Sequence, residues 1–323
     1  MSELPLPDLH LGRIGYGAAN LGNLYRAIDD DEAWQILEAA WNSGVRYFDT
    51  APHYGLGLSE RRLGSFLATK PRAEFVVSTK AGRLLRPDPA GADRLDEEND
   101  FAVPAHCKRV WDFTAGGMRR SLEESLQRLG LDAVDALYLH DPERHDLRRG
   151  VEEALPALEG LRDEGLVRAG GVASMSTRAL LAGARSGCVD LLMVAGRLTL
   201  VDQSAADEVL PECLSRGIGV IAAAVFNSGL LASRRPSADS LFDYGPVPAD
   251  LLGRTRRIAE VCGEYDVPLP VAALHYPFRA PMVRSVVVGA ATPEQVRQNA
   301  CSLERKPPPG LWQRLRDEGL VRL

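Results

Sequence analysis

The sequence predicts a (β/α)8 barrel, in which eight parallel strands form a closed sheet and helices surround it. Eight short, nearly continuous apolar runs alternate with longer segments whose apolar residues recur at helical spacing. Strands buried on both faces have such continuous runs, as expected for a parallel sheet covered by helices. A length of 323 residues is common for a barrel of this type, so we expect residues 1–323 to form one domain.

The apolar runs and the helical segments follow one another in the order that the barrel requires. The predicted strands are residues 13–17, 45–49, 75–80, 134–140, 168–174, 190–196, 218–225 and 284–290. In the first predicted helix, Trp34, Leu37 and Trp41 fall at positions i, i+3 and i+7. Several helices end on glycine, which tolerates the left-handed position after a helix. The predicted helices are residues 31–44, 118–130, 152–165, 177–187, 205–217 and 250–265.

Two long segments interrupt this alternation, residues 82–113 after the third strand and residues 227–249 after the seventh. Long loops in a compact domain are usually functional or disordered. Both loops follow strand ends on the face where barrel active sites are built. We therefore expect them to cover a pocket, with a solvated, poorly ordered insertion as the alternative for residues 87–103.

Composition and charge exclude several classes of partner. A net charge of −6 argues against a nucleic-acid or anionic-membrane surface, which needs clustered lysine and arginine. The five cysteines are scattered without a C-x-x-C pair, and the first ten residues lack the pattern of a signal peptide. The sequence therefore indicates a cytoplasmic protein with a small-molecule partner, and nothing in it indicates an oligomeric state.

Four titratable side chains follow or close neighbouring predicted strands. Asp49 and Tyr54 come after the second strand, Lys80 closes the third and His140 closes the fourth. Each has a structural alternative. Asp49 would cap a turn, Tyr54 would be an aromatic residue at the rim, Lys80 a solvated strand end and His140 a hydrogen-bonded core histidine. Because the carboxyl ends of adjacent parallel strands lie at one height, we expect all four to converge.

Such a set suits the transfer of a proton to and from an oxygen. A tyrosine has a pKa of about 10, and a nearby ammonium lowers that pKa by stabilising the phenolate. We expect Lys80 to supply the ammonium, Asp49 to hold Lys80 and a neutral His140 to orient an oxygen beside Tyr54. No metal site is expected, because His140 and His145 are isolated from other plausible ligands.

The sequence resembles the aldo-keto reductase family in the segments 48–55 (FDTAPHYG), 78–82 (STKAG) and 138–142 (YLHDP). The resemblance implies a nicotinamide-dependent oxidoreductase, with Asp49, Tyr54, Lys80 and His140 as its catalytic residues. Tyr54 would then be the general acid in reduction and the general base in oxidation. Residues 13–25 and 51–67 are most similar to the family's sugar 1-dehydrogenases, which implies hydride transfer between nicotinamide and C1 of an aldose such as L-fucose.

Other functions stay open at this point. Within the family, the alternatives are oxidation of pyridoxal and general reduction of aldehydes or ketones. A non-catalytic nicotinamide-binding regulatory subunit is an alternative of another class. A barrel hydrolase or lyase that uses Asp49 and His140 without a cofactor is a third.

The cofactor has its own signal in residues 288–299 (VGAATPEQVRQN), a strand that runs into a helix. Thr292 is placed to cap this helix and Gln295 to complete a capping box, and the free N–H groups of a helix start also bind phosphate. The resemblance implies cofactor contacts from Ser174, Arg197, Phe226, Gly289, Ala290, Thr292, Gln295, Gln298 and Asn299. NADP-preferring relatives carry a lysine and an arginine where this chain has Gly289 and Gln295, which slightly favours NAD over NADP.

Three further residues are expected to contact a sugar. Asn20 and His53 lie on loops at the same face of the barrel and are suited to hydrogen-bond ring hydroxyls. Trp111, or its neighbour Phe113, is expected to cover an apolar face of the sugar from the loop after the third strand. The alternative for these aromatic residues is that they anchor the loop.

Overall fold

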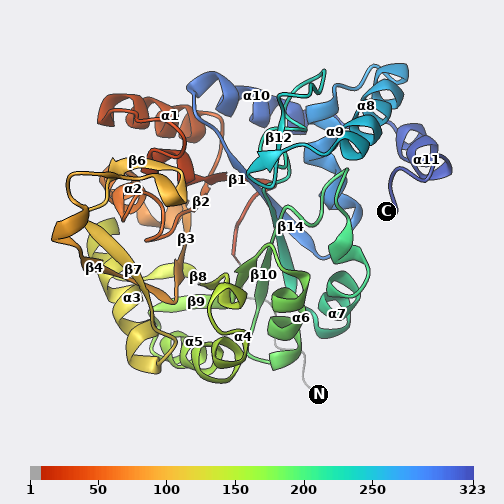
Figure 1. Cartoon of the computed structure of the whole chain (residues 1–323). Helices are drawn as coiled ribbons and strands as arrows, with labels where there is room; N and C mark the ends of the chain where they lie inside the picture. The colour runs from red at the N-terminus through yellow and green to blue at the C-terminus, as the bar shows by residue number, and fades with distance from the viewer. Residues whose placement is uncertain (1–8) are drawn as a thin grey trace.

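The structure is a computed structural model that describes residues 9–323, and it forms a closed barrel of eight parallel strands (Figure 1). Residues 1–8, part of the stretch without a signal-peptide pattern, lie outside the described residues. Around the barrel the order is β1-β14-β11-β10-β9-β8-β3-β2. All eight predicted strands are confirmed: β1 Ile14–Gly17, β2 Tyr47–Asp49, β3 Val76–Ala81, β8 Val134–His140, β9 Val167–Ser174, β10 Leu191–Ala195, β11 Gly219–Ala223 and β14 Val283–Gly289.

The six predicted helices are present, although two begin differently. Residues 150–154 form a π turn before α5, and α7 begins only at Val209. Helix α2 was not predicted because its inward face carries Ser59 and Glu60, both fully buried, which obscures the apolar period. The helices are α1 Asp30–Asn42, α2 Leu58–Leu67, α3 Ala115–Leu129, α4 Leu147–Arg149, α5 Leu155–Asp163, α6 Thr177–Ser186, α7 Val209–Arg216, α8 Ala249–Glu264, α9 Leu269–His275, α10 Pro293–Glu304 and α11 Pro309–Asp317.

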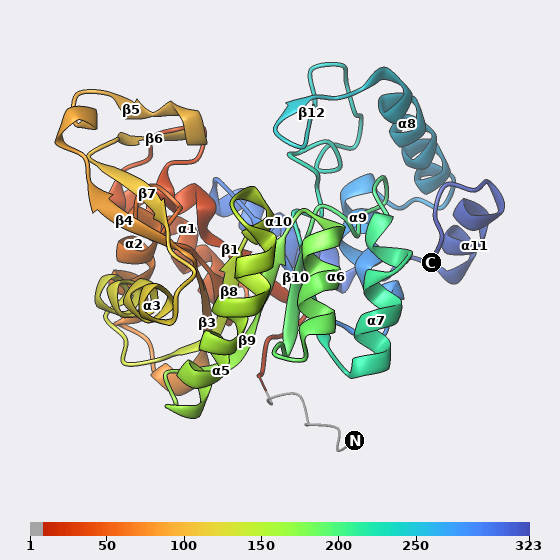
Figure 2. The same cartoon turned by 60° about the horizontal axis from the view of Figure 1, so that its bottom comes forward.

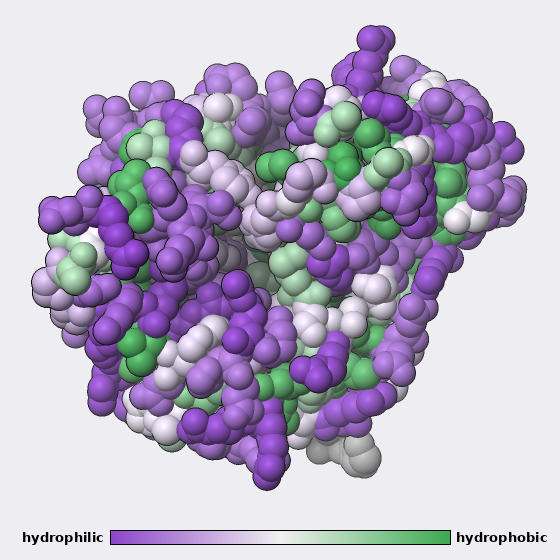
Figure 3. Space-filling view, viewed as in Figure 1, coloured by the Kyte–Doolittle hydropathy of each residue, from purple (hydrophilic) through white to green (hydrophobic). Residues whose placement is uncertain are grey.

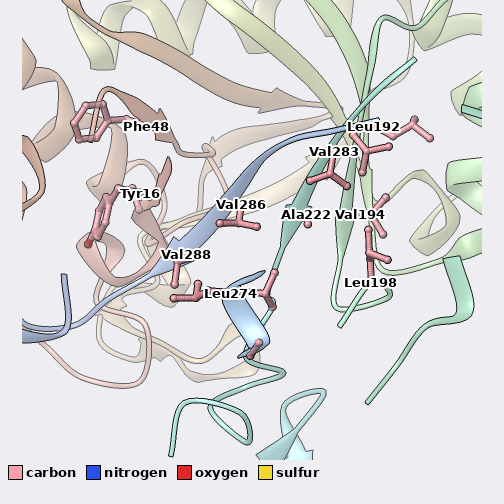
Figure 4. Close-up of a cluster of buried hydrophobic side chains, with 14 of the residues drawn as sticks. Tyr16, Phe48, Leu192, Val194, Leu198, Ala222, Leu274, Val283, Val286 and Val288 are labelled. Carbon is pink, nitrogen blue, oxygen red and sulfur yellow. The ribbon is translucent and has the colours of Figure 1, made fainter. Parts of the chain in front are cut away.

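Two hydrophobic clusters lie on the two faces of the sheet. The larger one joins the strands to the helices, with side chains such as Phe48, Val194 and Val286 (Figure 4). The smaller one includes Tyr47 and Tyr138 and belongs to the alternate strand positions. Because alternate residues of a strand point to opposite faces, the second cluster fills the interior of the barrel and forms the floor of any site at its carboxyl end.

The two long loops are folded, and Figure 2 shows both at the same end of the barrel. In the first, β4 Arg83–Pro87 pairs with β7 Cys107–Trp111, and β5 Leu95–Asp96 pairs with β6 Phe101–Pro104. The alternative of a poorly ordered insertion at residues 87–103 is therefore wrong. The second loop contains a small hairpin of β12 Leu241–Phe242 and β13 Gly245–Pro246.

The second loop is tied to the barrel by one arginine. Arg197, just after β10, forms ion pairs with Asp202 and with Asp243 of the loop, and it donates to the Met175 carbonyl over 2.9 Å.

Within residues 9–323, no helix is both long and apolar enough to cross a bilayer.

Candidate active site

A cavity of about 1370 Å³ opens at the carboxyl end of the barrel. Figure 3 shows the hollow near the middle of this face, bordered mostly by hydrophilic residues. Strand ends, both long loops and α10 contribute to its walls, and all four residues predicted to be catalytic line it. Pockets for small ligands usually occupy about 300–1,000 Å³. The cavity is therefore large enough for a dinucleotide together with a small substrate.

Lys80 and Asp49 form a buried ion pair at the inner end of the cavity. Lys80 Nζ donates to Asp49 Oδ2 over 2.7 Å and to the Thr50 carbonyl over 2.9 Å. The other carboxylate oxygen accepts a hydrogen bond from Ser78 Oγ at 2.7 Å. Burial lowers the pKa of Lys80, but Asp49 and Tyr54 outweigh it and raise that pKa above its ordinary value. Lys80 is therefore a fixed positive charge at neutral pH.

Tyr54 is held beside that charge by the close contact of two loops. Gly55 has a φ of +60°, and a Cβ atom there would lie 2.2 Å from the carbonyl oxygen of Gly22, so only glycine fits. Lys80 Nζ lies 4.7 Å from the centre of the Tyr54 ring. Burial raises the pKa of Tyr54, and Lys80 opposes that rise without reversing it. Lys80 therefore lowers the pKa of Tyr54 as predicted, but the net pKa is raised because desolvation of the phenolate exceeds its attraction to the ammonium.

His140 completes the group as a neutral ring. Its ring centre lies 6.1 Å from that of Tyr54. Burial, followed by the charges of Arg83 and Lys80, lowers the pKa of His140 well below 6.5. His53 lies 5.7 Å from His140 between ring centres, and its pKa is also lowered, first by burial and then by Arg109. Both imidazoles are therefore uncharged at neutral pH, as predicted for His140.

A second ion pair, partly buried, lies beside His140, and the sequence did not indicate it. Arg83 Nη2 donates to Asp141 Oδ2 over 2.6 Å, and the same oxygen lies 3.6 Å from His140 Nε2. The Arg83 guanidinium packs 4.4 Å from the ring centre of Trp111. The motif YLHDP contains Asp141, but its partner is 58 residues away on β4. Pairing across that separation depends on how the loop after β3 folds.

The outer end of the cavity is formed largely by α10 and the strand before it. Gly289, Ala290, Gln295, Gln298 and Asn299 line it, together with Ser174 and Phe226 nearer the centre. A Cβ atom at Gly289 would lie 3.2 Å from Asn20 Oδ1, so the absent side chain keeps the wall open there. Arg234, Arg297 and Arg305 also line the cavity. A glycine-walled channel with a helix start and arginines fits the pyrophosphate and adenosine of a nicotinamide dinucleotide.

Ser174 lies between the two ends of the cavity and is firmly oriented. Its hydroxyl donates to Glu143 Oε1 over 2.6 Å and accepts from the Ser176 N–H at 2.8 Å. Burial raises the pKa of Glu143. Sequence reasoning missed Glu143, since no residue pattern links it to Ser174.

Three predicted contacts do not line the cavity themselves, although Ala291 and Gln295 on either side of Thr292 do. Arg197 is engaged by the two aspartates described above, and Thr292 acts as the cap of α10, accepting from the Gln295 N–H at 3.2 Å. Trp111 packs against Arg83 and stacks on His145 with ring centres 5.4 Å apart.

The hairpin folding of the loop after β3 explains the correction at Trp111. The end of that loop pairs with β4 and turns away from the cavity, whereas its middle reaches the opening with Phe101. Phe113 is buried in the core, 2.9 Å from where a Cβ atom on Gly82 would lie. Asn20 and His53 do line the cavity.

A barrel that gathers a buried lysine–aspartate pair, a tyrosine and a neutral histidine next to a dinucleotide-sized channel defines a nicotinamide-dependent oxidoreductase. The model of the aldo/keto reductase family matches residues 13–316, so the chain belongs to that family. This confirms the predicted resemblance, and together with the dehydrogenase relatives described next it supports an oxidoreductase over the cofactor-free hydrolase and the non-catalytic subunit.

Two curated relatives match nearly the whole chain. D-threo-aldose 1-dehydrogenase from Pseudomonas sp is 56% identical over 314 residues, covering 97% of this chain and 95% of that protein. Pyridoxal 4-dehydrogenase from Microbacterium luteolum is 37% identical, covering 95% and 94%. Among solved structures, the glycerol dehydrogenase of Gluconobacter oxydans has a TM-score of 0.77 at 22% identity, covering 97% of this chain and 93% of that one. At that identity the structure supports the fold alone.

Proposed function

We propose that the protein oxidises C1 of an aldose, such as L-fucose, to the lactone and reduces a nicotinamide cofactor. The observation that carries this proposal is the convergence of Asp49, Tyr54, Lys80 and His140 at the inner end of a large cavity. The relative with 56% identity, a D-threo-aldose 1-dehydrogenase, supports the choice of substrate class.

The four residues divide the work of proton transfer. The bound nicotinamide would supply the hydride acceptor. Tyr54, as the phenolate, takes the proton of the anomeric hydroxyl, and Lys80, whose Nζ lies 4.7 Å from the centre of the Tyr54 ring, stabilises that phenolate. Asp49 keeps Lys80 charged and in place. His140 is neutral, so it donates a hydrogen bond to the sugar oxygen without placing a second cation beside Lys80.

The remaining predicted residues are proposed as binding contacts. Ser174 and Phe226 would hold the nicotinamide ring, and the residues from Gly289 to Asn299 would hold the adenosine half. Asn20 and His53 would contact the hydroxyls of the sugar. Phe101 from β6, whose ring centre is 6.2 Å from that of Tyr54, replaces Trp111 as the aromatic residue placed to cover the sugar.

NAD is proposed to be accepted at least as well as NADP. Gly289 and Gln295 offer no charge to a 2′-phosphate. Two of the three arginines that line this end of the cavity have carboxylate partners, since Arg297 lies 3.1 Å from Glu294 and Arg305 lies 2.8 Å from Asp266. A dianionic phosphate without a cationic partner lacks charge-assisted hydrogen bonds of about 1.5–3 kcal/mol each. A much lower Michaelis constant for NADP than for NAD would refute this preference.

Oxidation of pyridoxal is the second candidate, because a relative with 37% identity is a pyridoxal 4-dehydrogenase. The absorbance of reduced nicotinamide separates the two candidates when L-fucose, D-arabinose, L-galactose and pyridoxal are each supplied with NAD or NADP. We expect activity in the aldoses that share one configuration from C2 to C4. Strong oxidation of pyridoxal alone would select the second candidate. Faster reduction of simple aldehydes than oxidation of any aldose would overturn both.

A further inference from the structure

Asp141 presents a carboxylate to the cavity directly beside the catalytic group. It follows His140 at the end of β8 and lines the cavity wall. Its backbone has a φ of +43°, a conformation that is rare for residues other than glycine. The backbone is fixed there because the Asp141 N–H donates to the Ala173 carbonyl over 2.9 Å and its carbonyl accepts from the Arg144 N–H at 3.1 Å. Unusual backbone conformations of this kind concentrate at functional sites.

The side chain of Asp141 is fixed as well, with one oxygen engaged and the other available. Oδ2 accepts from Arg83 at 2.6 Å, and the side chains of Arg83 and Asp141 are 5% and 17% exposed. Within residues 9–323, no donor forms a hydrogen bond with Oδ1. A carboxylate oxygen with free lone pairs at a cavity wall is a good acceptor for a hydroxyl group. Because Arg83 already fixes the orientation of the Asp141 carboxylate, ligand binding would not lose free energy to the ordering of this side chain.

The position of this carboxylate narrows which substrate group it can contact. Asp141 Oδ2 lies 3.6 Å from Nε2 of His140, the ring that holds the reacting oxygen in the proposed mechanism. The carboxylate therefore lies beside the atoms bonded to the reacting carbon, which in an aldopyranose carry the ring oxygen and the C2 hydroxyl, and only the hydroxyl can donate to a carboxylate. We propose that Asp141 accepts a hydrogen bond from the C2 hydroxyl of the aldose and so selects 2-hydroxy substrates. This inference rests on the proposed function and deepens it.

The structure makes Arg83 the residue that positions this acceptor. Without Asp141, the buried guanidinium would lose its partner, and without Arg83 the carboxylate would be free to rotate away from the substrate. A site built to bond a substrate hydroxyl rejects an analogue that lacks it, because the buried acceptor is then left unpaired. Simple aldehydes without a neighbouring hydroxyl should therefore be poor substrates.

A cycle that combines one protein change with one substrate change tests the proposal. Wild type and Asp141→Asn are each assayed with L-fucose and with 2-deoxy-L-fucose, using the full chain and saturating NAD. We expect Asp141→Asn to lower kcat/KM for L-fucose about 10- to 100-fold and to change kcat/KM for the 2-deoxy sugar less than about threefold. Asparagine keeps an oxygen for Arg83, so the fold should be retained, and a melting curve with NAD titration verifies this.

Glu97→Gln is the matched control, since it removes one exposed negative charge from the loop after β3 that does not line the cavity. It should leave both substrates within twofold. If Asp141→Asn lowers activity equally on both sugars, or on neither, the inference is overturned while the proposed function stands. If wild type oxidises no aldose at all, the proposed function fails and the inference fails with it. Should Asp141→Asn prove unstable, Asp141→Glu in the same cycle must show the same selective loss.

Discussion

The two ends of the cavity hold their charges in opposite ways. At the inner end, Lys80 and Asp49 have side chains that are 2% and 4% exposed, and their ion pair has little access to solvent. At the outer end, Arg297 and Glu294 are 61% and 69% exposed. Water and salt ions cannot compensate for the loss of one partner in a buried ion pair. An exposed pair contributes little, because solvent screens it. Substitutions at the inner end should therefore have far larger effects than those at the outer end.

The largest effect should follow removal of the proton carrier. Tyr54→Phe deletes one hydroxyl and little volume, so we expect kcat to fall about 10²- to 10⁴-fold while nicotinamide affinity stays nearly unchanged. Steady-state kinetics and a fluorescence titration with the cofactor measure the two quantities separately. Retention of most activity would show that proton transfer is assigned to the wrong residue.

Lys80→Met should come next and should change the pH dependence as well as the rate. Aldose oxidation needs the phenolate, so the rate rises with pH towards the pKa of Tyr54. Lys80 lowers that pKa against the larger effect of burial, and its loss must raise the pKa further. We expect the pH–rate profile of oxidation to shift to higher pH, with a loss of about 10²-fold at neutral pH. An unshifted profile would contradict the coupling between Lys80 and Tyr54.

Gln295→Arg at the outer end should have a smaller and more selective effect. The arginine would supply a missing cation for a 2′-phosphate, so the Michaelis constant for NADP should fall about tenfold relative to that for NAD. Arg297→Gln is the control and should change that ratio less than twofold, because Arg297 pairs with Glu294. A large loss of NADP binding in the control would place the phosphate on Arg297 instead.

Asp243→Asn, which weakens the tie between Arg197 and the loop after β11, should have an effect of only two- to fivefold. The two side chains are 16% and 27% exposed, and pairs near the surface contribute about 0.2–1 kcal/mol. Stopped-flow release of reduced cofactor should become faster by that factor. A hundredfold change would mean that this loop behaves like the buried end of the cavity.

The last prediction is that the pH dependence shows no effect of His140. Burial holds the pKa of His140 well below 6.5, so His140 stays neutral as the pH falls from 7.5 to about 6. Protonation of His140 should therefore not lower kcat/KM near pH 6.5. Any fall of kcat/KM at acid pH in the wild type should also be present in His140→Gln. Detection of such a limb would mean that His140 titrates and becomes charged during the reaction.

The same contrast explains what the sequence could predict. Asp49, Lys80 and His140 lie at or near the ends of adjacent buried strands, and strand order alone brings such positions together at one rim. The pair of Arg83 and Asp141 was not predictable, because it depends on the fold of a hairpin rather than on strand order. Trp111 was misplaced for the same reason. The direction of the Tyr54 pKa depends on a balance between burial and charge, and a sequence gives no measure of burial.

The loop contact between Gly22 and Gly55 has a consequence for how this protein can change over evolutionary time. A methyl group on Gly22 would lie 2.6 Å from the backbone carbon of Tyr54, and one on Gly55 would strike Gly22 in return. Neither loop can acquire a side chain there without moving the proton carrier. Gly22 ends the turn η1 Ala18–Gly22, which also carries Asn20, so the loops of Asn20 and Tyr54 must diverge together or stay as they are. The β5–β6 hairpin is tied to the same segment, because Leu24 pairs with Phe101 and the Ala102 N–H donates to the Asn23 carbonyl over 2.9 Å, so a change of substrate preference there is coupled to the loop of Asn20.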